Sequence, residues 1–266
     1  MRLWTPTWLP AAALLSGALA GCATPPPASD KDALADYRQT NDPLEPTNRV
    51  LFAVANGFNE VVIRPLAVGY VNAVPGVVRT HVHNVLANLN TPVILVNDMM
   101  QGKPHRAGTT LMRMVINTTA GIGGIFDVAS DLGYPEHSSD FGETLAIWGV
   151  PEGPFLYLPI LGPTDPRDAI GYGIDIALNP ETWLLTTGPE MNLEYSQFGL
   201  YIIDIYADLM PDLDKVQEQA LDPYATFRSL YRQHRHAQID AIRNDHTATS
   251  PDHWFPNSQP DSQPAQ

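Results

Sequence analysis

One residue of this chain is placed for covalent chemistry: Cys22, its only cysteine. It closes the tetrapeptide Leu19-Ala20-Gly21-Cys22, the lipobox pattern in which a cysteine thiol is acylated. The apolar run Trp8–Ala20 follows Arg2 and is shorter than the roughly 20 residues needed to cross a bilayer. We therefore expect Cys22 to carry a covalent diacylglycerol and an N-acyl chain. The alternative is a plain signal peptide with an incidental cysteine.

The histidines of the chain do not fall into a metal-binding pattern. They include the pairs His81/His83 and His234/His236, and helical residues two apart point to different faces. Neither pair can therefore bind one metal ion without other partners. The chain also lacks the Gly-x-Ser-x-Gly and His-Glu-x-x-His motifs of hydrolases. We expect no catalysis, no cofactor and no metal, and an envelope hydrolase is the less favoured alternative.

Two further patterns have ordinary structural interpretations. Gly121-Ile122-Gly123-Gly124 lacks the preceding strand and the Gly-Lys-Ser/Thr of a phosphate-binding loop, so we expect a bend between two helices. Asp204 and Asp208 are four residues apart and are expected on the solvated side of a helix. The sequence thus predicts neither a nucleotide site nor a pair of catalytic carboxylates.

The net charge excludes a nucleic-acid function. The chain has 15 Lys and Arg against 29 Asp and Glu, a net charge of −14, and is repelled by nucleic acids and by anionic lipid surfaces. The last helix is locally basic. Its arginines are interpreted either as a solvated face that pairs with acidic neighbours or as a contact for an acidic partner or lipid phosphates. The candidate contacts are Arg228, Arg232 and Arg235.

The elements that must position these residues are helical. A capping residue followed by proline, a typical helix start, occurs five times. Helical spacing of apolar residues supports long helices near residues 189–210 and 223–244. Alternating strand patterns and Asn-Gly or Asp-Gly turns are lacking, so the predicted fold class is all-α. The five starts are Asp42-Pro43, Thr91-Pro92, Asp165-Pro166, Asn179-Pro180 and Asp222-Pro223.

Three helical segments, Val50–Ala55, Val93–Val96 and Leu111–Ile116, are interpreted as apolar on every side. Such helices lie in a protein core or in lipid. The segment Phe141–Asp168 is rich in Gly, Pro and large apolar side chains, so neither a long helix nor a central strand can run through it. A broken apolar backbone is tolerated at membrane depth where it packs in protein or lines a cavity. Because each helical segment is too short to cross, we expect immersed helices to lie in the membrane plane.

These patterns divide the chain into four parts. Residues 1–21 are the predicted signal peptide, and residues 22–40 form a Pro-rich lipidated tether. Residues 41–246 form the helical domain. Residues 247–266 are rich in Ser, Pro and Gln and are predicted to be disordered.

Ordered motifs along the chain resemble the MlaA (VacJ) family of outer-membrane lipoproteins. The resemblance covers about residues 41–235. Pro46-Thr47 departs from the Gly-Phe common in the family, and Lys103 from a frequent acidic residue. The motifs are Asn41-Asp42-Pro43-Leu44-Glu45, Asn48-Arg49, Arg64-Pro65, Gln101-Gly102, Ile116-Asn117-Thr118, Gly123-Gly124, Phe126-Asp127-Val128-Ala129, Phe141-Gly142-Glu143-Thr144-Leu145, Trp148-Gly149-Val150, Gly153-Pro154, Leu158-Pro159, Gly162-Pro163, Arg167-Asp168 and Asp222-Pro223-Tyr224.

The resemblance implies a ring-like arrangement of helices lying in the membrane plane, in the inner leaflet of the outer membrane, around a central amphipathic channel. Mislocalised phospholipids would leave the outer leaflet through this channel and pass to a soluble periplasmic carrier of the MlaC type. The implied partners are phospholipids and a trimeric porin of the outer membrane. Such transport preserves lipid asymmetry. A purely structural, porin-associated lipoprotein is the alternative.

Within this frame the broken segment is the candidate wall or mouth of the channel, and the helices around residues 50–63 and 111–129 are expected to be immersed. A lipid head group cannot cross hydrocarbon without a polar path, because an unpaired buried charge costs several kcal/mol or more. The candidate channel-lining or lipid-contacting residues are Phe141, Leu145, Trp148, Phe155, Tyr157 and Leu158.

Overall fold

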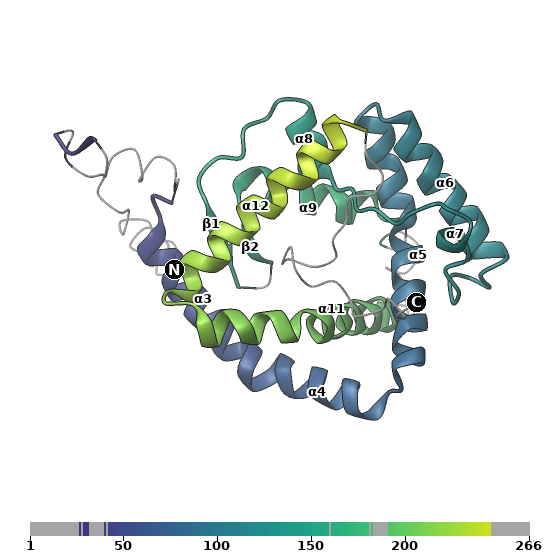
Figure 1. The fold of residues 1–266 in the computed structure, drawn as a ribbon, viewed down its shortest axis with the longest axis horizontal. Coiled ribbons are helices and arrows are strands. Elements are labelled where there is room, and N and C mark those ends of the chain that lie inside the picture. Colours follow the sequence, from purple (N-terminus) through teal and green to yellow (C-terminus); the bar gives the residue numbers. More distant parts are fainter. Residues whose placement is uncertain are drawn as a thin grey trace, which may run out of the picture. The chain divides into compact units, whose positions relative to one another are not determined.

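The computed structural model describes residues 27, 29–31, 40, 42–159, 161–180, 182 and 191–245. The predictions for the signal peptide, for Cys22 and for the tail 247–266 lie outside the described residues, as does most of the tether. Helices make up nearly all of the regular structure in the described part of the chain (Figure 1). The all-α prediction is confirmed, with one short hairpin in addition.

Contacts divide the chain into two compact units. Among the described residues, the first contains those up to residue 57 together with those from 152 to 166, and the second contains 58–151 together with those from 167 to 245. In the first unit, α3 (Glu45–Phe58) packs beside a hairpin of β1 (Leu156–Leu158) and β2 (Gly162–Thr164), which pair antiparallel.

Asn48 fixes α3 to the hairpin inside the first unit. Its side-chain amide donates to Asp42 at 2.8 Å and to the carbonyl of Phe155 at 3.0 Å, and its oxygen accepts from the N–H of Tyr157. The Phe52 ring meets the Tyr157 ring edge-on at 5.3 Å. A buried amide therefore completes the hydrogen bonding of β1, which is one way that a three-residue strand becomes stable.

Helix α3 continues without a break through a π-helix, η1 (Asn59–Ile63), into α4 (Arg64–Ala73). Pro65 has no N–H, so it cannot donate a hydrogen bond to the carbonyl one turn earlier in the helix. The wider turn of a π-helix accommodates this missing hydrogen bond. By length and composition alone, the 29-residue stretch Glu45–Ala73 is enough to cross a membrane, and 11% of its apolar window is buried. The segment Val50–Ala55, which by itself is too short to cross, is part of this longer helix, because Pro65 does not end it.

The second unit is built from helices that pack in pairs. Helix α5 packs on α6, α4 on α11, and α8 on α12. The two short helices are α7 and α8. The bounds are α5 Gly76–Met100, α6 Pro104–Thr119, α7 Val128–Asp131, α8 Phe141–Ile147, α9 Pro166–Leu178, α11 Met191–Gln219 and α12 Pro223–Arg243.

The predicted helix starts have mixed outcomes. Helices α9 and α12 begin at Pro166 and Pro223 as predicted, and the Asp222 carboxylate caps α12. Helix α3 begins at Glu45, later than predicted, and the Asp42 carboxylate accepts from Asn48. The start at Asn179-Pro180 falls where most of the following residues are not described.

The start predicted at Thr91-Pro92 is wrong, because α5 runs straight through Pro92. The Thr91 hydroxyl donates to the carbonyl of Ala87 at 3.2 Å, so the threonine bonds back along the helix instead of capping a new one. Helix α11 likewise continues through Pro211, beyond its predicted end at Met210.

A close approach of α9 to α8 gives a prediction with a built-in control. A Cβ on Gly171 would collide with backbone atoms of Gly142, whereas a Cβ on Gly173, on the same helix, meets nothing within 4 Å. We expect Gly171→Ala to destabilise the protein by about 1–3 kcal/mol through overpacking. Gly173→Ala should stabilise it by about 0.5–1 kcal/mol, because alanine is the better helix former. Thermal unfolding of the two variants checks this, and equal midpoints would contradict the close contact.

Candidate functional site

Helix α6 turns polar side chains inward and apolar side chains outward. Its buried face recurs at helical spacing and is entirely polar. On the opposite face Leu111, Met112 and Val115 are exposed. The prediction that Leu111–Ile116 is apolar on every side is wrong, because Arg113 lies within it and points inward. The buried residues of α6 are Arg106, Thr109, Thr110, Arg113 and Asn117.

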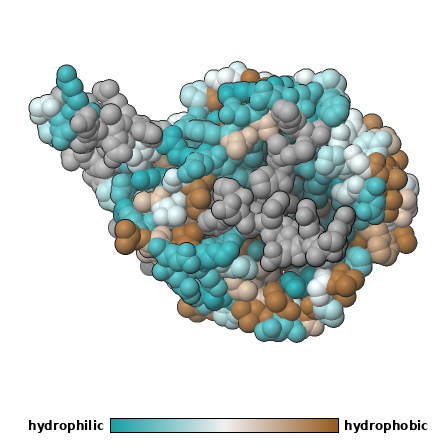
Figure 2. All heavy atoms as spheres, viewed as in Figure 1, coloured by the Kyte–Doolittle hydropathy of each residue, from teal (hydrophilic) through white to brown (hydrophobic). Residues whose placement is uncertain are grey.

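The same arrangement, with polar side chains buried and apolar side chains exposed, is found over much of the described chain. Polar and charged side chains outnumber apolar ones among the fully buried described residues. Large apolar side chains are exposed along α3, η1 and α4, at both ends of α5 and beyond α6. In Figure 2, brown apolar residues gather at the edge of the view over α4 and over α6 and α7. Exposed apolar surface of this extent marks an interaction with a membrane or a partner.

Asp98, at 0% exposure, is the centre of the polar seam between α5 and α6. It accepts from Thr110 at 2.6 Å, lies 2.8 Å from His137 Nε2, and pairs with Arg106 at 3.4 Å. Arg106 also donates to the carbonyl of Ser138 at 2.7 Å. The buried charge is thus fully partnered, as a low-dielectric interior requires.

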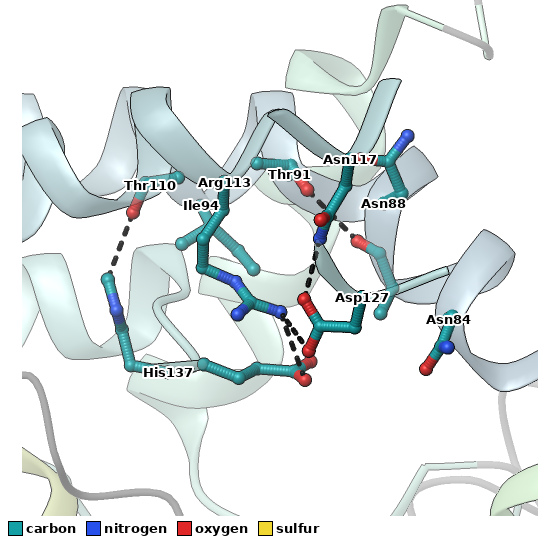
Figure 3. Close-up of a pocket in the computed structure, with 11 residues that line it drawn as sticks. Asn84, Asn88, Thr91, Ile94, Thr110, Arg113, Asn117, Asp127 and His137 are labelled. Atoms are coloured by element: carbon teal, nitrogen blue, oxygen red, sulfur yellow. Dashed lines mark hydrogen bonds and ion pairs between the residues drawn. The ribbon is translucent and has the colours of Figure 1, made fainter. Parts of the chain in front are cut away.

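A small polar pocket lies beside this seam and is centred on Arg113 (Figure 3). The Arg113 guanidinium ion pairs with Asp127 at 3.2 Å and Glu136 at 3.3 Å. Burial alone would raise the pKa of Asp127, but hydrogen bonds from Ser130 and Asn117, with the Arg113 charge, bring it below its usual value. The remaining lining residues are Asn84, Ala87, Asn88, Thr91, Ile94, Thr110 and His137.

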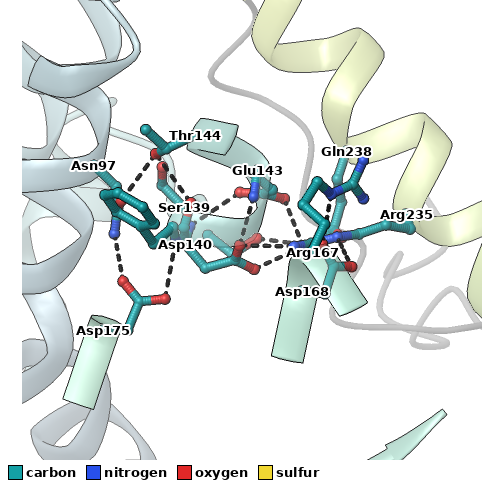
Figure 4. Close-up of polar contacts among 12 residues, drawn as sticks. Asn97, Ser139, Asp140, Glu143, Thr144, Arg167, Asp168, Asp175, Arg235 and Gln238 are labelled. Carbon is teal, nitrogen blue, oxygen red and sulfur yellow. Dashed lines mark hydrogen bonds and ion pairs between the residues drawn. The ribbon is translucent and has the colours of Figure 1, made fainter. Parts of the chain in front are cut away.

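Arg235 of α12 clamps three carboxylates (Figure 4). Its two terminal nitrogens bind Asp140 at 2.6 and 2.7 Å, and its Nε lies 2.6 Å from Asp168. Glu143, at 0% exposure, lies 3.3 Å from the same guanidinium. Asp168 also accepts from Tyr231 at 2.6 Å. A bidentate arginine at the centre of such a cluster fixes α12 to α8 and α9.

The electrostatics of this clamp differ between its carboxylates. Burial, with repulsion from Asp140, raises the pKa of Glu143 to about 8, against the opposing charge of Arg235. Burial alone would raise the pKa of Asp168, but the Arg235 charge and three hydrogen bonds bring it below its usual value. Asp140 and Glu143 also form a capping box that starts α8. The start of α8 therefore supplies the two residues of its capping box, and the same two carboxylates also face Arg235.

A chain of amides and hydroxyls continues from α8 to α5 and α9 (Figure 4). Thr144 donates to Asn97 at 2.8 Å, and Asn97 donates to Asp175 at 2.8 Å. Gln101 donates to both Ser139 and Thr144. Burial raises the pKa of Asp175 to about 6. The interior of this unit is thus polar, and many of its buried side chains form hydrogen bonds with one another.

His83 and Asp204 differ from their predicted surroundings. Asp204 is 3% exposed, accepts from Tyr70 and lies 3.0 Å from His83 Nδ1, so the prediction of a solvated side is wrong for Asp204. Asp208 is exposed, as predicted. The hydrogen bond with Asp204 raises the pKa of His83 to about 9, although burial opposes it. His83, Asp204 and Asp208 each have one possible metal-ligand atom, and these three atoms lie within 4.8 Å of one another, but His83 already shares a proton with Asp204 in a hydrogen bond.

The six residues proposed to line a channel have different environments. Phe141, Phe155 and Tyr157 are buried, and Leu145 and Leu158 are half-buried. Trp148 is 54% exposed, stacks edge-on against Phe141 and donates its indole N–H to the carbonyl of Met100. A lipid-contacting role for these residues stays a prediction, and Trp148 is the member that the described structure leaves accessible.

The three candidate arginines of α12 also differ. Arg235 is 8% exposed and committed to Asp140, Glu143 and Asp168, so contact with an outside partner would have to break these pairs. Arg228 stacks its guanidinium on the Tyr224 ring at 5.5 Å. For Arg228 and Arg232 a partner contact stays a prediction.

Two features of the interior are visible in the sequence and were missed. Asp140-x-x-Glu143 before an apolar stretch is a capping-box signature, which indicates a helix start inside the broken segment. The polar residues of α6 recur at helical spacing, so the polar stripe opposite the apolar one is readable as well.

Outward apolar faces around a hydrogen-bonded polar interior define a class: a helical protein built to lie against an apolar medium. The model of the MlaA lipoprotein family matches residues 40–238. The intermembrane phospholipid transport system lipoprotein MlaA of Haemophilus influenzae is 33% identical over 233 residues, 86% of this chain and 89% of its own. An uncharacterised protein of Rickettsia bellii is 36% identical over 208 residues, 78% of this chain and 80% of its own.

A solved structure gives the same assignment. It comes from work on the structural basis for maintenance of bacterial outer membrane lipid asymmetry, and it shares 31% sequence identity with this chain. The TM-score is 0.65, and the match covers 74% of this chain and 98% of that chain. The chain belongs to the MlaA lipoprotein family. The resemblance stated from its motifs is thereby confirmed.

Proposed function

We propose that this chain is an outer-membrane lipoprotein that removes mislocalised phospholipids from the outer leaflet through a passive channel. It hands them to a soluble periplasmic carrier for retrograde transport between the membranes and so maintains lipid asymmetry. Acylated Cys22 anchors it on the periplasmic face. The observation that carries the proposal is a polar interior behind apolar outward faces, in a member of a family that includes a Haemophilus influenzae protein named for phospholipid transport.

The polar interior suits a lipid head group. A phosphate or ammonium crossing hydrocarbon loses its hydration, and a path lined by side-chain donors and acceptors replaces it. The pocket around Arg113 offers a guanidinium and several amides from α5 and α6, and two carboxylates from Asp127 at the start of α7 and Glu136 beyond it. The acyl chains need no such path, because they can follow the apolar outer faces. Transfer of this kind requires no chemical step.

Two charged side chains favour helices that lie in the membrane plane over helices that cross it. Glu60 and Arg64 lie near the middle of the stretch Glu45–Ala73, where a crossing helix would put them at the bilayer centre. Arg64 instead pairs with Asp214 of α11 at 2.5 Å and with Glu60 at 3.5 Å. A charged edge along one side and exposed valines along the other are typical of an interfacial helix.

The other parts of the proposal come from the family. Helices lie in a ring around the channel, and the protein is held against a trimeric porin. Trp148, an exposed aromatic residue in the broken segment, is the preferred lipid-contacting residue of the six candidates. Aromatic side chains with one polar atom are well suited to the membrane interface.

Deletion of the gene tests the proposed function directly. We expect phospholipid to accumulate in the outer leaflet and sensitivity to detergent to rise, because the retrograde route is lost. A plasmid copy of the gene should reverse both effects. A Cys22→Ser copy should reverse neither, because the protein is no longer anchored by its acyl chains. Outer-leaflet phospholipid is measured by surface labelling or by lipid A palmitoylation. Unchanged outer-leaflet phospholipid in the deletion strain would favour the structural, porin-associated alternative.

A further inference from the structure

Helix α11 packs against both α4 and α5, and a polar cluster joins the three helices (Figure 1). The cluster consists of Tyr70 of α4, His83 of α5, and Asp204 and Asp208 of α11. His83 Nδ1 lies 3.0 Å from Asp204 Oδ2, and the Tyr70 hydroxyl donates to Asp204 Oδ1 at 3.0 Å. None of these four residues lines the pocket around Arg113.

The fold gives His83 partners that the spacing of the histidines does not. His81 and His83 point to different faces of α5, and His81 lies against the carbonyl of Ile125 at 2.9 Å. His83 faces α11 instead, where Asp204 and Asp208 are one helical turn apart and so lie on one face. One imidazole and two carboxylates thus meet, although His83 and Asp204 are 121 residues apart in the sequence.

The separations within this trio suit a metal ion. Ligand atoms bound at 2.0–2.1 Å around a tetrahedral zinc ion are about 3.3 Å apart. The 3.0 Å between His83 Nδ1 and Asp204 Oδ2 is close to that value, so one ion can bind both atoms after a small movement. The three ligand atoms lie within 4.8 Å of one another, and the carboxylate of exposed Asp208 can rotate to shorten the longer separation. Water would complete the coordination, as in open zinc sites.

The surroundings provide an oriented ligand and an entry path. The hydrogen bond from Tyr70 holds one oxygen of Asp204 and leaves the other directed at His83. Hydrogen bonds of this kind orient carboxylates that bind metals. The Asp204 side chain is 5% exposed, whereas the His83 side chain is 38% exposed. An ion can therefore enter from the side of His83 and Asp208.

The charge of the cluster favours a divalent cation. Arg79, one turn before His83 on α5, contributes one positive charge nearby. An imidazole with two carboxylates selects zinc and similar transition metals, whereas calcium and magnesium prefer oxygen ligands alone. The metal must displace the proton that His83 shares with Asp204, so its binding is stronger at higher pH. The carboxylates that act electrostatically on His83 are those of Asp204, Asp208 and Glu136.

We propose that His83, Asp204 and Asp208 form a binding site for a divalent transition-metal ion, Zn²⁺ first among them, which joins α5 to α11. The site is independent of the proposed function, because lipid transfer needs no metal. Its effect is structural: the ion ties α11 to α5, while Tyr70 links α4 to the same carboxylate.

Zinc titration of the purified protein tests the site. The protein carries no histidine tag, is stripped of metal with a chelator, and is held at pH 8 in a non-ionic detergent. We expect wild type to bind one equivalent of Zn²⁺ by calorimetry. Asp208→Asn should bind about 10-fold more weakly or worse, since even an outer-shell partner of a metal site contributes 10- to 100-fold. This variant keeps the hydrogen bond between His83 and Asp204, so its unfolding midpoint without zinc should match wild type.

Glu218→Gln is the matched control, because it removes the same charge from an exposed position of the same helix. It should bind Zn²⁺ as wild type does. At 100 times the Kd, zinc should raise the unfolding midpoint of wild type and of Glu218→Gln by about 5–10 °C. The midpoint of Asp208→Asn should move much less at that concentration.

The other outcomes overturn the proposal. Equal zinc affinity in Asp208→Asn and Glu218→Gln would place the ion elsewhere on the protein. Wild type that binds no zinc at pH 8 would show that His83 and Asp204 form only an ion pair. His83→Gln gives a second check, because it removes the imidazole and should also lose the zinc-dependent rise in midpoint.

Discussion

Replacing Arg235 with alanine is expected to destabilise the protein by about 3–5 kcal/mol, because it breaks a buried charge cluster: Asp140 loses its bidentate partner, and Asp168 is left with Arg167 as its one remaining guanidinium. Asp168 and Glu143 are almost completely shielded from water and both face this guanidinium. A stability loss of this size is a large part of the roughly 5–15 kcal/mol that holds a typical domain folded. The measurement is chemical unfolding of the purified protein in detergent.

Two further variants show whether charge is the cause. Arg243→Ala, on the same helix, removes an exposed arginine paired only with exposed Asp240, and should change stability by about 0.5 kcal/mol or less. Asp168→Asn in the Arg235→Ala background should recover part of the loss, since a buried carboxylate that has lost one of its two arginine partners is removed. If Arg235→Ala proved as stable as Arg243→Ala, the clamp would not be holding α12 in place.

The helix starts could be predicted where the deciding contacts are local. The Asp222 carboxylate caps an N–H three residues away, so the contact that starts this helix can be predicted from neighbouring residues in the sequence. Thr91-Pro92 shows the same two residue types inside a helix. There the hydroxyl bonds back to Ala87, and packing against α6 carries α5 past the missing N–H of Pro92. A local pattern does not report that packing, so the two cases look alike in the sequence.

The inverted polarity was only partly predictable. Exposed apolar faces were expected from Val50–Ala55 and Leu111–Ile116, and the structure exposes Val50, Val54, Leu111 and Val115. What the apolar faces surround was not expected. The partners of Arg235 include Asp140, 95 residues earlier in the chain, and no periodicity links residues that far apart. Sequence patterns report which face of a helix differs from the other, whereas the pairing of buried charges is decided by tertiary contacts.

The stability of the protein should fall as pH rises from about 4.5 to about 8, and Glu143 should be a main cause. Its folded-state pKa of about 8 lies above its ordinary value of 4.5, because burial and the neighbouring Asp140 disfavour the charged form. Between these values the folded protein holds a proton that the unfolded chain releases. The contribution is fully present below pH 4.5 and is lost as pH rises through 8, with a slope of up to about 1.4 kcal/mol per pH unit.

Glu143→Gln isolates this contribution. Glutamine keeps an oxygen that can accept from the N–H of Asp140, as Glu143 does at 3.1 Å, but it cannot ionise. We expect the variant to match wild type near pH 5 and to be more stable above pH 8. His83, with a pKa raised to about 9, and Asp175, with a pKa raised to about 6, add slopes of the same sign to both proteins. The difference between the two unfolding curves therefore reports Glu143 alone.

The opposite sign applies to Asp168, which gives the experiment an internal control. Its pKa is below the ordinary value of 3.8, so its contribution is present above that value and is lost as pH falls further. Both proteins retain Asp168 and should lose stability together on the acid side. A constant offset between wild type and Glu143→Gln from pH 5 to pH 9 would mean that Glu143 is ionised in the folded protein. Arg235 would then hold three charged carboxylates, and the clamp would bear a net negative charge.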